Sequence, residues 1–536
     1  MVALVLVPVV LGVALYRLPL RAAQVLALAG QGWVAWRAVS LLTRSTRDGM
    51  FAEVLGGSDH LLYISLRGER TALTFVLLTV LLFTAALVWT LRSSYADNKL
   101  LLLLLVLQGL SAGIFLTDDV FNLFVLFEVA TLTAVLLVMF KKDRRNTYDG
   151  LYYLVVQIVA MLFFLFGVAY LYRTFGVLSV TEIGLMVQQG VDGRALVLPF
   201  AFMLTGIALK AGLFPLFSYV PRSYGNPGAP TVMLVLMSGV LVKGALFWLA
   251  RLIDVFAPAL DLGVFLVVVG LVTGVAGAAK ALAQTDVRLL LAYSTVSQAG
   301  LITIALATGS AASSGGAVLH MVNHALLKTV LFLTAAMIVR RYGTARLAEL
   351  RGVARRMPLV AVVSAVAVLG MVGAPFTGGG ASKDLILAGA GGTWAAVAIW
   401  VVNAGTMLVF VKYAAMFFGT PEREPVRDGA HANKTGVVVA LALVCVAAGV
   451  LAPQLAYVLV GDAVAVPAGT TLAKVAAFAL LLAGALLAHR FATPAARRLR
   501  GPLEQTLSLP QACLALTVFF GAAALFGTLA VPGVAT

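Results

Sequence analysis

The stretch of sequence that decides the fold reads Leu204-Thr205-Gly206-Ile207-Ala208-Leu209-Lys210-Ala211-Gly212-Leu213-Phe214-Pro215. It starts as an apolar helix long enough to cross a membrane, and it carries a lysine at membrane depth. A cation at that depth costs roughly 2.5–3.5 kcal/mol on insertion scales and usually faces a partner or a water-filled cavity. The Gly and Pro that follow break the helix and free backbone carbonyls, which need protein or water to satisfy them. Lysine and break together indicate a path for ions.

The composition of the whole chain is that of a polytopic membrane protein, with 536 residues of which 62% are hydrophobic and 11% charged. The apolar runs are long and show no two-residue alternation, which predicts an all-α bundle and excludes a barrel. The net charge of +16 lies mostly in short clusters between apolar segments, so it indicates topology and no nucleic-acid partner. Cys445 and Cys513 form no CxxC pair, and we expect no metal, cluster or other cofactor.

About sixteen apolar segments are long enough to span a bilayer. The seventh is interrupted near Gly212 and Pro215, and the twelfth near Gly373, Pro375 and the glycines at 378–380. The expected cores are 2–16, 22–42, 71–92, 98–117, 119–140, 150–172, 195–220, 231–251, 260–283, 287–308, 316–340, 357–390, 393–419, 435–457, 469–491 and 510–531.

The loops between these segments set the orientation. With this count, the four densest basic clusters fall on one side, which is therefore cytoplasmic, and both termini are external. The chain is apolar from Val2, without a basic region before it, and this favours a first membrane helix over a cleaved signal. The longest external loop is 43–70, in which residues 61–66 read as a short strand. The basic clusters are 141–145, 340–356, 423–434 and 490–500.

The two broken segments lie five segments apart, which indicates an internal repeat. Segments four to eight would match segments nine to thirteen, and because five is odd the second copy is inverted, as in many transporters. The predicted units are the N-terminal helices 1–97, the first repeat 98–251, the second repeat 260–419 and the C-terminal helices 435–536.

Charged residues inside the first repeat are the strongest candidates for function. Glu128 lies mid-segment and is expected to pair with Lys210 and take part in proton movement; a structural ion pair is the alternative, although membrane ion pairs stabilise poorly. Lys243 lies too far inside the next segment for its charge to reach the surface easily. Asp118 and Asp119, at the helix entrance, are either a solvated helix end or a proton antenna.

The second repeat carries its own titratable groups. His320, His324 and Lys328 are spaced i, i+4 and i+8, so they share one helix face. Two histidines at i, i+4 can bind zinc or hold helices together, but three aligned protonatable groups in a membrane suit a relay better. Lys383 follows the second break and is the counterpart of the first broken-helix lysine.

Three further features of this repeat have an ordinary structural explanation beside a functional one. Asp384 either pairs with Lys383 or faces solvent, and Lys412 reaches the nearby membrane surface. The hydroxyl groups at 293–297 either carry a water wire or pack helices together.

Several motifs, in order along 117–385, resemble those of antiporter-like subunits in respiratory complex I and in Mrp-type multisubunit cation/proton antiporters, with the D-type Mrp subunit first among them. The resemblance implies a fourteen-helix core with two inverted five-helix units and discontinuous helices seven and twelve. It also implies that Glu128, Lys210, Lys243 and Lys383 form a mid-membrane proton path, with His320, His324 and Lys328 as its central connection. The motifs are 119–128, 209–216, 219–221, 228–231, 238–243, 285–298, 324–328, and 373–375 with Ser382 and Lys383.

The sequence also departs from the family pattern. Ala374 and Pro375 stand where two prolines are usual, the glycine run 378–380 is longer than usual, and Ser218 and Tyr219 replace a frequent histidine. About two extra C-terminal helices are expected, and 458–509 is too short and interrupted for the long surface helix of the longest members.

The resemblance implies a proton-translocating subunit of a multisubunit Na⁺/H⁺ antiporter in a bacterial or archaeal inner membrane. Its partners would be other membrane subunits, H⁺, Na⁺ and the lipid bilayer. One alternative is a proton-pumping membrane subunit of a complex I-like NADH:quinone oxidoreductase or of a membrane-bound hydrogenase. Redox chemistry would then belong to the partners, because the chain shows no nucleotide, haem or cluster motif. A structural scaffold subunit is the other alternative.

Overall fold

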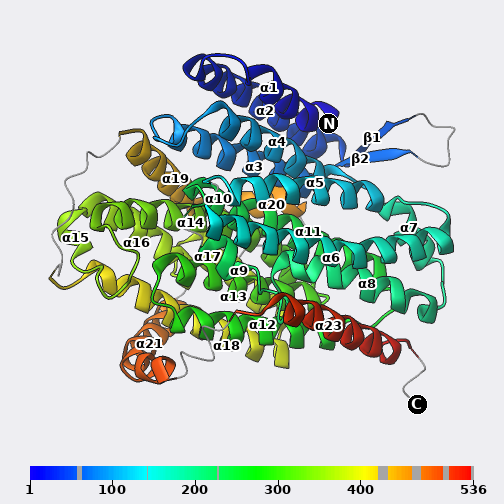
Figure 1. Ribbon diagram of the computed structural model, residues 1–536. Helices are drawn as coiled ribbons and strands as arrows, with labels where there is room; N and C mark the ends of the chain where they lie inside the picture. The colour runs from blue at the N-terminus through cyan, green and yellow to red at the C-terminus, as the bar shows by residue number, and fades with distance from the viewer. Residues whose placement is uncertain are drawn as a thin grey trace.

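The computed structural model describes residues 1–56, 63–141, 143–225, 228–420, 432–461, 472–498 and 506–532. Fourteen of its helices are long and apolar enough to cross a membrane. Two shorter apolar helices, α1 (Val2–Leu15) and α16 (Pro358–Val372), complete the sixteen segments expected from the sequence. The all-α polytopic fold is therefore confirmed, and Figure 1 shows the helices running side by side across the molecule.

The first half of the bundle places α1 and α2 along one edge and the remaining helices beneath them (Figure 1). The short helix α7 (Val180–Gln188) links two spanning helices at one end. The spanning helices are α2 (Leu20–Asp48), α3 (Arg70–Thr90), α4 (Asn98–Leu116), α5 (Val120–Val138), α6 (Arg144–Phe175) and α8 (Gly193–Ala211).

The second half begins with a composite helix. Its parts are α10 (Thr231–Leu236), the π-helical turn η1 (Met237–Leu241) and α11 (Val242–Phe256). The helices after it are α12 (Gly263–Ala283), α13 (Val287–Ala307), α14 (Ala311–Tyr342), α15 (Val353–Arg356), α16, α17 (Gly378–Ala390) and α18 (Trp394–Ala414). The C-terminal ones are α19 (Ala432–Val450), α20 (Ala452–Val460), α21 (Leu472–Arg498) and α23 (Leu509–Leu529).

Small residues let the central helices approach closely. On α12, Gly270, Gly274 and Gly277 lie close to other helices, and Gly300 of α13 packs against the first two. A Cβ added to Gly300 would lie 2.4 Å from the Gly270 carbonyl oxygen, so only glycine fits. This is the packing that membrane helices use where lipid supplies no hydrophobic drive for association.

Both predicted breaks are present. The first follows α8, where Gly212 has the left-handed backbone (φ 73°) that ends a helix, and the chain resumes as α9 (Val220–Tyr224). The second lies between α16 and α17, where Gly373 (φ 79°) ends one half and the Thr377 hydroxyl caps the other by accepting from the Gly380 N–H at 3.1 Å. Each break leaves carbonyls of the last helical turn free for side chains.

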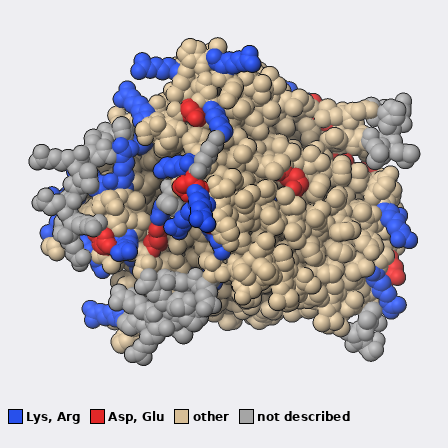
Figure 2. All heavy atoms as spheres, viewed as in Figure 1, with Lys and Arg blue, Asp and Glu red and all other residues tan. Residues whose placement is uncertain are grey.

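The expected strand at 61–66 is displaced. A two-stranded antiparallel hairpin pairs β1 (Phe51–Leu55) with β2 (Ile64–Gly68), in a register that sets Phe51 opposite Gly68; positions 61 and 62 lie outside the described residues. The strand β1 was not predicted, because its side chains are mostly exposed and do not alternate. Figure 1 shows this hairpin at the opposite end of the bundle from α15, and Figure 2 shows Lys and Arg gathered mainly toward the α15 end.

The loop leading into β2 is tied to α7. The Tyr63 hydroxyl donates a hydrogen bond to the Glu182 carboxylate, which raises the pKa of Tyr63 to about 12. A raised tyrosine pKa contributes stability that is present below the ordinary value of 10.0 and is lost as pH rises toward 12.

We therefore expect the thermal stability of the wild-type chain to fall across about pH 10 to 12 more steeply than that of Tyr63→Phe. Tyr172→Phe, on an exposed tyrosine of α6, is the matched control and should follow the wild type. Identical alkaline profiles for wild type and Tyr63→Phe would show that this bond contributes nothing.

Candidate functional site

Lys210 lies in the last turn of α8, directly before the break. Its ammonium group is buried and donates hydrogen bonds to the Thr131 hydroxyl at 2.8 Å and to the Gln157 side-chain oxygen at 3.1 Å. The Tyr219 hydroxyl, from the segment beyond the break, donates to the Lys210 carbonyl at 3.2 Å. The break thus brings a hydroxyl group to the freed carbonyl and holds the lysine between α5 and α6.

Glu128 lies on the same helix as Thr131, three residues earlier, and hence on the same face. The expected direct ion pair between Glu128 and Lys210 is not formed, because the ammonium group bonds Thr131 and Gln157 instead. Oε1 of Glu128 is buried and has no hydrogen-bond partner among the described residues. A buried carboxylate oxygen without a partner costs free energy, so Glu128 is poised to take a proton or a donor.

A cavity adjoins Lys210 and extends toward the composite helix. Its empty volume is about 370 Å³, and hydroxyl, amide and ammonium groups on its wall give water several partners. The far wall includes Leu241 and Val242, which directly precede Lys243. It is lined by Phe127, Ala130, Thr131, Tyr153, Gln157, Lys210, Tyr219, Met237, Leu241 and Val242.

Lys243 sits one residue into α11, after the π-helical turn. Its ammonium group donates to the Ser238 carbonyl at 2.9 Å and lies 2.6 Å from Nδ1 of His324 on α14. Such wide turns occur often at functional sites. The turn was not predicted, because a one-residue widening leaves no trace in hydrophobic periodicity.

The two histidines on α14 are connected to different partners. His324 bonds Lys243 through Nδ1, and its buried Nε2 has no partner among the described residues. His320 is engaged at both nitrogens, with the Ser382 hydroxyl 2.9 Å from Nδ1 and the Gln298 side-chain oxygen 2.9 Å from Nε2. The ring centroids are 6.1 Å apart. A shared zinc ion does not fit, because His320 has no free nitrogen and an ammonium group adjoins His324.

Lys328 is fully buried one turn beyond His324 along α14. It donates to the Leu291 carbonyl at 2.8 Å and to the Ser294 hydroxyl, and it lies over the Phe410 ring at 5.4 Å. Ser294 was expected either to carry a water wire or to pack helices, and the structure places it in contact with a titratable group. These contacts to Lys328 come from α13 and α18.

Lys383 lies beside the second break, as Lys210 lies beside the first. Its ammonium group is buried and donates to the Met371 carbonyl at 2.8 Å, in the last turn of α16. The alternative pairing of Lys383 with Asp384 is not formed, because Asp384 binds Lys474 of α21 at 2.7 Å. Lys412 donates to the Leu282 carbonyl at 2.6 Å, near the end of α12.

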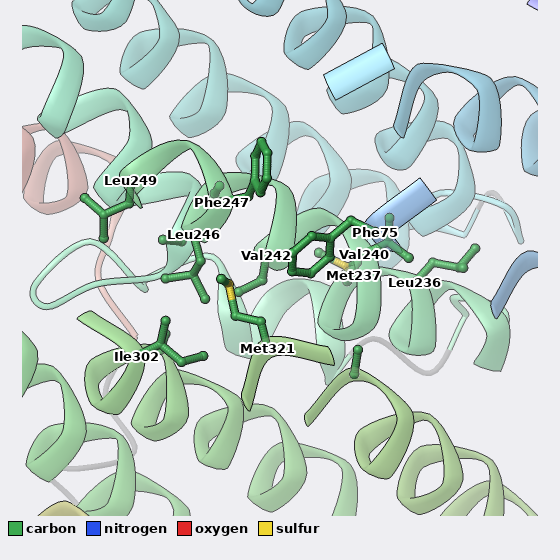
Figure 3. Close-up of a cluster of buried hydrophobic side chains, with 14 of the residues drawn as sticks. Phe75, Leu236, Met237, Val240, Val242, Leu246, Phe247, Leu249, Ile302 and Met321 are labelled. Carbon is green, nitrogen blue, oxygen red and sulfur yellow. The ribbon is translucent and has the colours of Figure 1, made fainter. Parts of the chain in front are cut away.

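The polar groups are embedded in an apolar core. Figure 3 shows Phe75, Phe247, Met237, Val242 and Met321 around the composite helix and α14. The Phe75 and Phe247 rings meet edge to face at 5.6 Å. This core keeps the surroundings of Lys243 and His324 at low dielectric, where hydrogen-bond partners matter most.

The structure brings most of the predicted site residues into two connected groups. Lys210 joins Thr131 and Gln157 beside Glu128, and Lys243 joins His324; His320 belongs to a further hydrogen-bonded group that includes Ser382. Thr131, Gln157 and Thr406 were not predicted as site residues, and Gln298 was not singled out. Their only signal was a polar side chain inside an apolar segment, which many helix-packing residues share.

The fold and the site define a class: polytopic helical membrane proteins with two broken helices and an internal series of lysine, histidine and glutamate side chains. The chain belongs to the NADH:quinone oxidoreductase/Mrp antiporter transmembrane family, whose model matches residues 117–411, more than half of its length.

Two curated relatives illustrate the sequence similarity. One is the N-type subunit of NADH-quinone oxidoreductase from Desulforudis audaxviator, 33% identical over 312 residues, covering 56% of this chain and 61% of the relative. The other is the D-type Na(+)/H(+) antiporter subunit of Alkalihalophilus pseudofirmus, 31% identical over 280 residues, covering 52% of this chain and 56% of the relative. The match thus spans less than two thirds of either relative.

Solved structures share the fold. A chain of the archaeal membrane-bound sulfane sulfur reductase has a TM-score of 0.78 at 23% identity, covering 90% of this chain and 99% of that one. A chain of the Mrp complex from Dietzia sp. DQ12-45-1b has a TM-score of 0.76 at 23% identity, covering 86% and 96%. A chain of Thermus thermophilus respiratory complex I has a TM-score of 0.75 at 22% identity, covering 90% and 99%.

Proposed function

We propose that this chain is the proton-translocating subunit of a multisubunit Na⁺/H⁺ antiporter and works beside other membrane subunits. The observation that carries the proposal is the series of buried titratable groups from Glu128 and Lys210 through Lys243 and His324 to Lys383. Buried charges in a membrane are costly, and five helices each contribute to this series. The relatedness to a D-type antiporter subunit supports the choice of ions.

A complex I-like membrane subunit is the second candidate, favoured by the relatedness to an N-type quinone oxidoreductase subunit. The same series of groups would serve it, with redox chemistry in partner subunits. Proteins that co-purify with the chain in mild detergent distinguish the two candidates. Small antiporter subunits support the first, and quinone- or hydrogen-oxidising subunits support the second.

The proposal includes the topology. The chain would lie in a bacterial or archaeal inner membrane with the α15 end in the cytoplasm and both termini outside. Helices 98–251 and 260–419 would form the inverted repeats, between the N-terminal helices 1–97 and the C-terminal helices 435–536. The basic residues gathered toward the α15 end agree with the rule that positive loops stay inside (Figure 2).

The function is tested in inside-out vesicles that hold the chain with its co-expressed partners. Addition of Na⁺ should dissipate a respiration-generated pH gradient, and vesicles without the chain should not respond. A gradient that is insensitive to Na⁺ and other monovalent cations, in vesicles that contain the assembled complex, contradicts the antiporter function.

Glu128→Gln keeps the size of the side chain and removes its charge. We expect a loss of Na⁺/H⁺ exchange of about a hundredfold, because a positioned proton-transfer group contributes roughly 10²–10⁴-fold. Glu349→Gln, in the loop before α15, is the matched control and should exchange at the wild-type rate. Normal exchange by Glu128→Gln would remove this carboxylate from the path.

A further inference from the structure

We propose that Gln298 and Thr406 hold His320 in one tautomer, so that its ring gains and loses a proton only at Nδ1, on the side of Ser382. This inference rests on the proposed proton path, and it assigns positioning roles to two residues outside the titratable series. Gln298 comes from α13, Thr406 from α18 and Ser382 from α17. The three helices thus meet around one imidazole of α14.

Thr406 sets the direction of the chain of hydrogen bonds. Its hydroxyl group donates its single hydrogen to the Val402 carbonyl at 2.9 Å, so it meets Gln298 with lone pairs. The Gln298 side-chain nitrogen donates to it at 2.7 Å. Because the nitrogen of the amide is engaged there, the amide oxygen faces His320. Both Gln298 and Thr406 are buried, which leaves the amide no solvent partner for the opposite orientation.

The amide oxygen in turn fixes the imidazole. It can only accept, and it lies 2.9 Å from Nε2 of His320, so Nε2 carries a hydrogen. A neutral imidazole has one N–H, and Nδ1 is therefore the bare nitrogen. Nδ1 accepts from the Ser382 hydroxyl at 2.9 Å. The Gln298 side of the ring can neither deliver nor receive a proton, because an amide oxygen has none to exchange.

Ser382 is the group that moves. Its hydroxyl oxygen lies within reach of both His320 Nδ1, at 2.9 Å, and the Gly379 carbonyl, at 3.0 Å, but it has one hydrogen. When the ring is neutral, that hydrogen points to Nδ1. When Nδ1 is protonated, the ring donates to Ser382, and the hydroxyl rotates to Gly379. Protonation of His320 thus requires one hydroxyl rotation and leaves Gln298 and Thr406 in place.

The charged groups around His320 agree with entry at this nitrogen. Lys383 on α17 and Lys243 on α11 both act on the ring, and His324 lies one turn along α14. Lys383 directly follows Ser382 in the chain. The α13 and α18 sides present the neutral Gln298 and Thr406 instead. A proton that reaches His320 therefore arrives from the side of the second helix break.

The tautomer is measured by ¹⁵N nuclear magnetic resonance on the histidine-labelled complex in lipid bilayers, with His320 assigned by its loss in His320→Asn. We expect wild-type His320, in its neutral form, to carry hydrogen at Nε2. Thr406→Val keeps the branched shape but removes the acceptor, so the Gln298 amide can reverse, and a population with hydrogen at Nδ1 should appear. Thr406→Ser should restore the wild-type spectrum.

Thr303→Val is the matched control, because Thr303 is buried on α13 and bonds the Ala299 carbonyl of its own helix. It should leave the His320 resonances unchanged. In transport, Thr406→Val should lower Na⁺/H⁺ exchange about tenfold and alter its pH profile, as expected for an altered proton-transfer group.

A wild-type ring with hydrogen at Nδ1 overturns the inference, and so does a Thr406→Val spectrum identical to the wild type. The spectrum reads the tautomer whether or not the complex exchanges Na⁺. An Nε2–H ring in a complex without exchange would therefore refute the proposed function alone.

Discussion

Lys210→Ala abolishes Na⁺/H⁺ exchange in vesicles while the chain still inserts and assembles. The substitution removes the ammonium group that joins Thr131 and Gln157 beside Glu128, on the wall of the polar cavity. Without it, the path from Glu128 to Lys243 loses its titratable group, and we expect a loss of at least roughly a hundredfold. Insertion should not suffer, because α8 becomes more apolar.

The matched control is Lys412→Ala. Lys412 also lies in a membrane helix and also donates to backbone carbonyls, but it lies near the ends of α12 and α18 and away from the series. It should keep most of the exchange activity. Membranes in which Lys210→Ala exchanges near the wild-type rate would contradict the proton path and would favour the structural-scaffold alternative.

Gly379→Ala is expected to destabilise the protein more than any other single added methyl group in the glycine run that begins α17. A Cβ at this position would lie 1.8 Å from the Gly370 carbonyl oxygen, in the backbone of the facing helix half. The helix propensity of alanine, worth about 1 kcal/mol, does not offset such an overlap. Overpacking costs about 1–3 kcal/mol where side chains can yield, and here a backbone must move.

The measurement is the thermal midpoint in detergent, read by size-exclusion chromatography after heating, together with exchange in vesicles. Both should fall, because the shift displaces Ser382 and Lys383 in the next turn of α17. Gly392→Ala is the matched control: an added Cβ there meets nothing within 4 Å. Equal midpoints for Gly379→Ala and the wild type would show that the two helix halves can separate freely.

The long glycine run that departs from the family pattern has a physical reason in the packing. A Cβ at Gly378 would lie 2.4 Å from Oδ1 of Asn323, and one at Gly380 would lie 2.4 Å from the Ala374 carbonyl oxygen. The start of α17 is thus pressed between α14 and the end of α16. Spacing alone could not reveal the contact with Asn323, because it joins segments that are far apart in the sequence.

Composition and helix breaks were sufficient to predict the bundle, since apolar length and Gly/Pro breaks act locally. They also placed the buried lysines beside the breaks. The partner of each lysine was less accessible to prediction. Opposite charges suggested a direct contact between Glu128 and Lys210, whereas the structure satisfies the ammonium group with a hydroxyl and an amide. Such a choice depends on side-chain positions across three helices, which no local pattern encodes.

Lys383 and Lys210 differ in the chemical nature of what holds them. Lys383 bonds a main-chain oxygen, which is present whatever residue occupies position 371, whereas Lys210 depends on the side chains of Thr131 and Gln157. Substitution can therefore retune the surroundings of Lys210 one residue at a time, but it can alter those of Lys383 only by reshaping the backbone. Adaptation of this protein to another ion or driving force should accumulate its changes around Lys210.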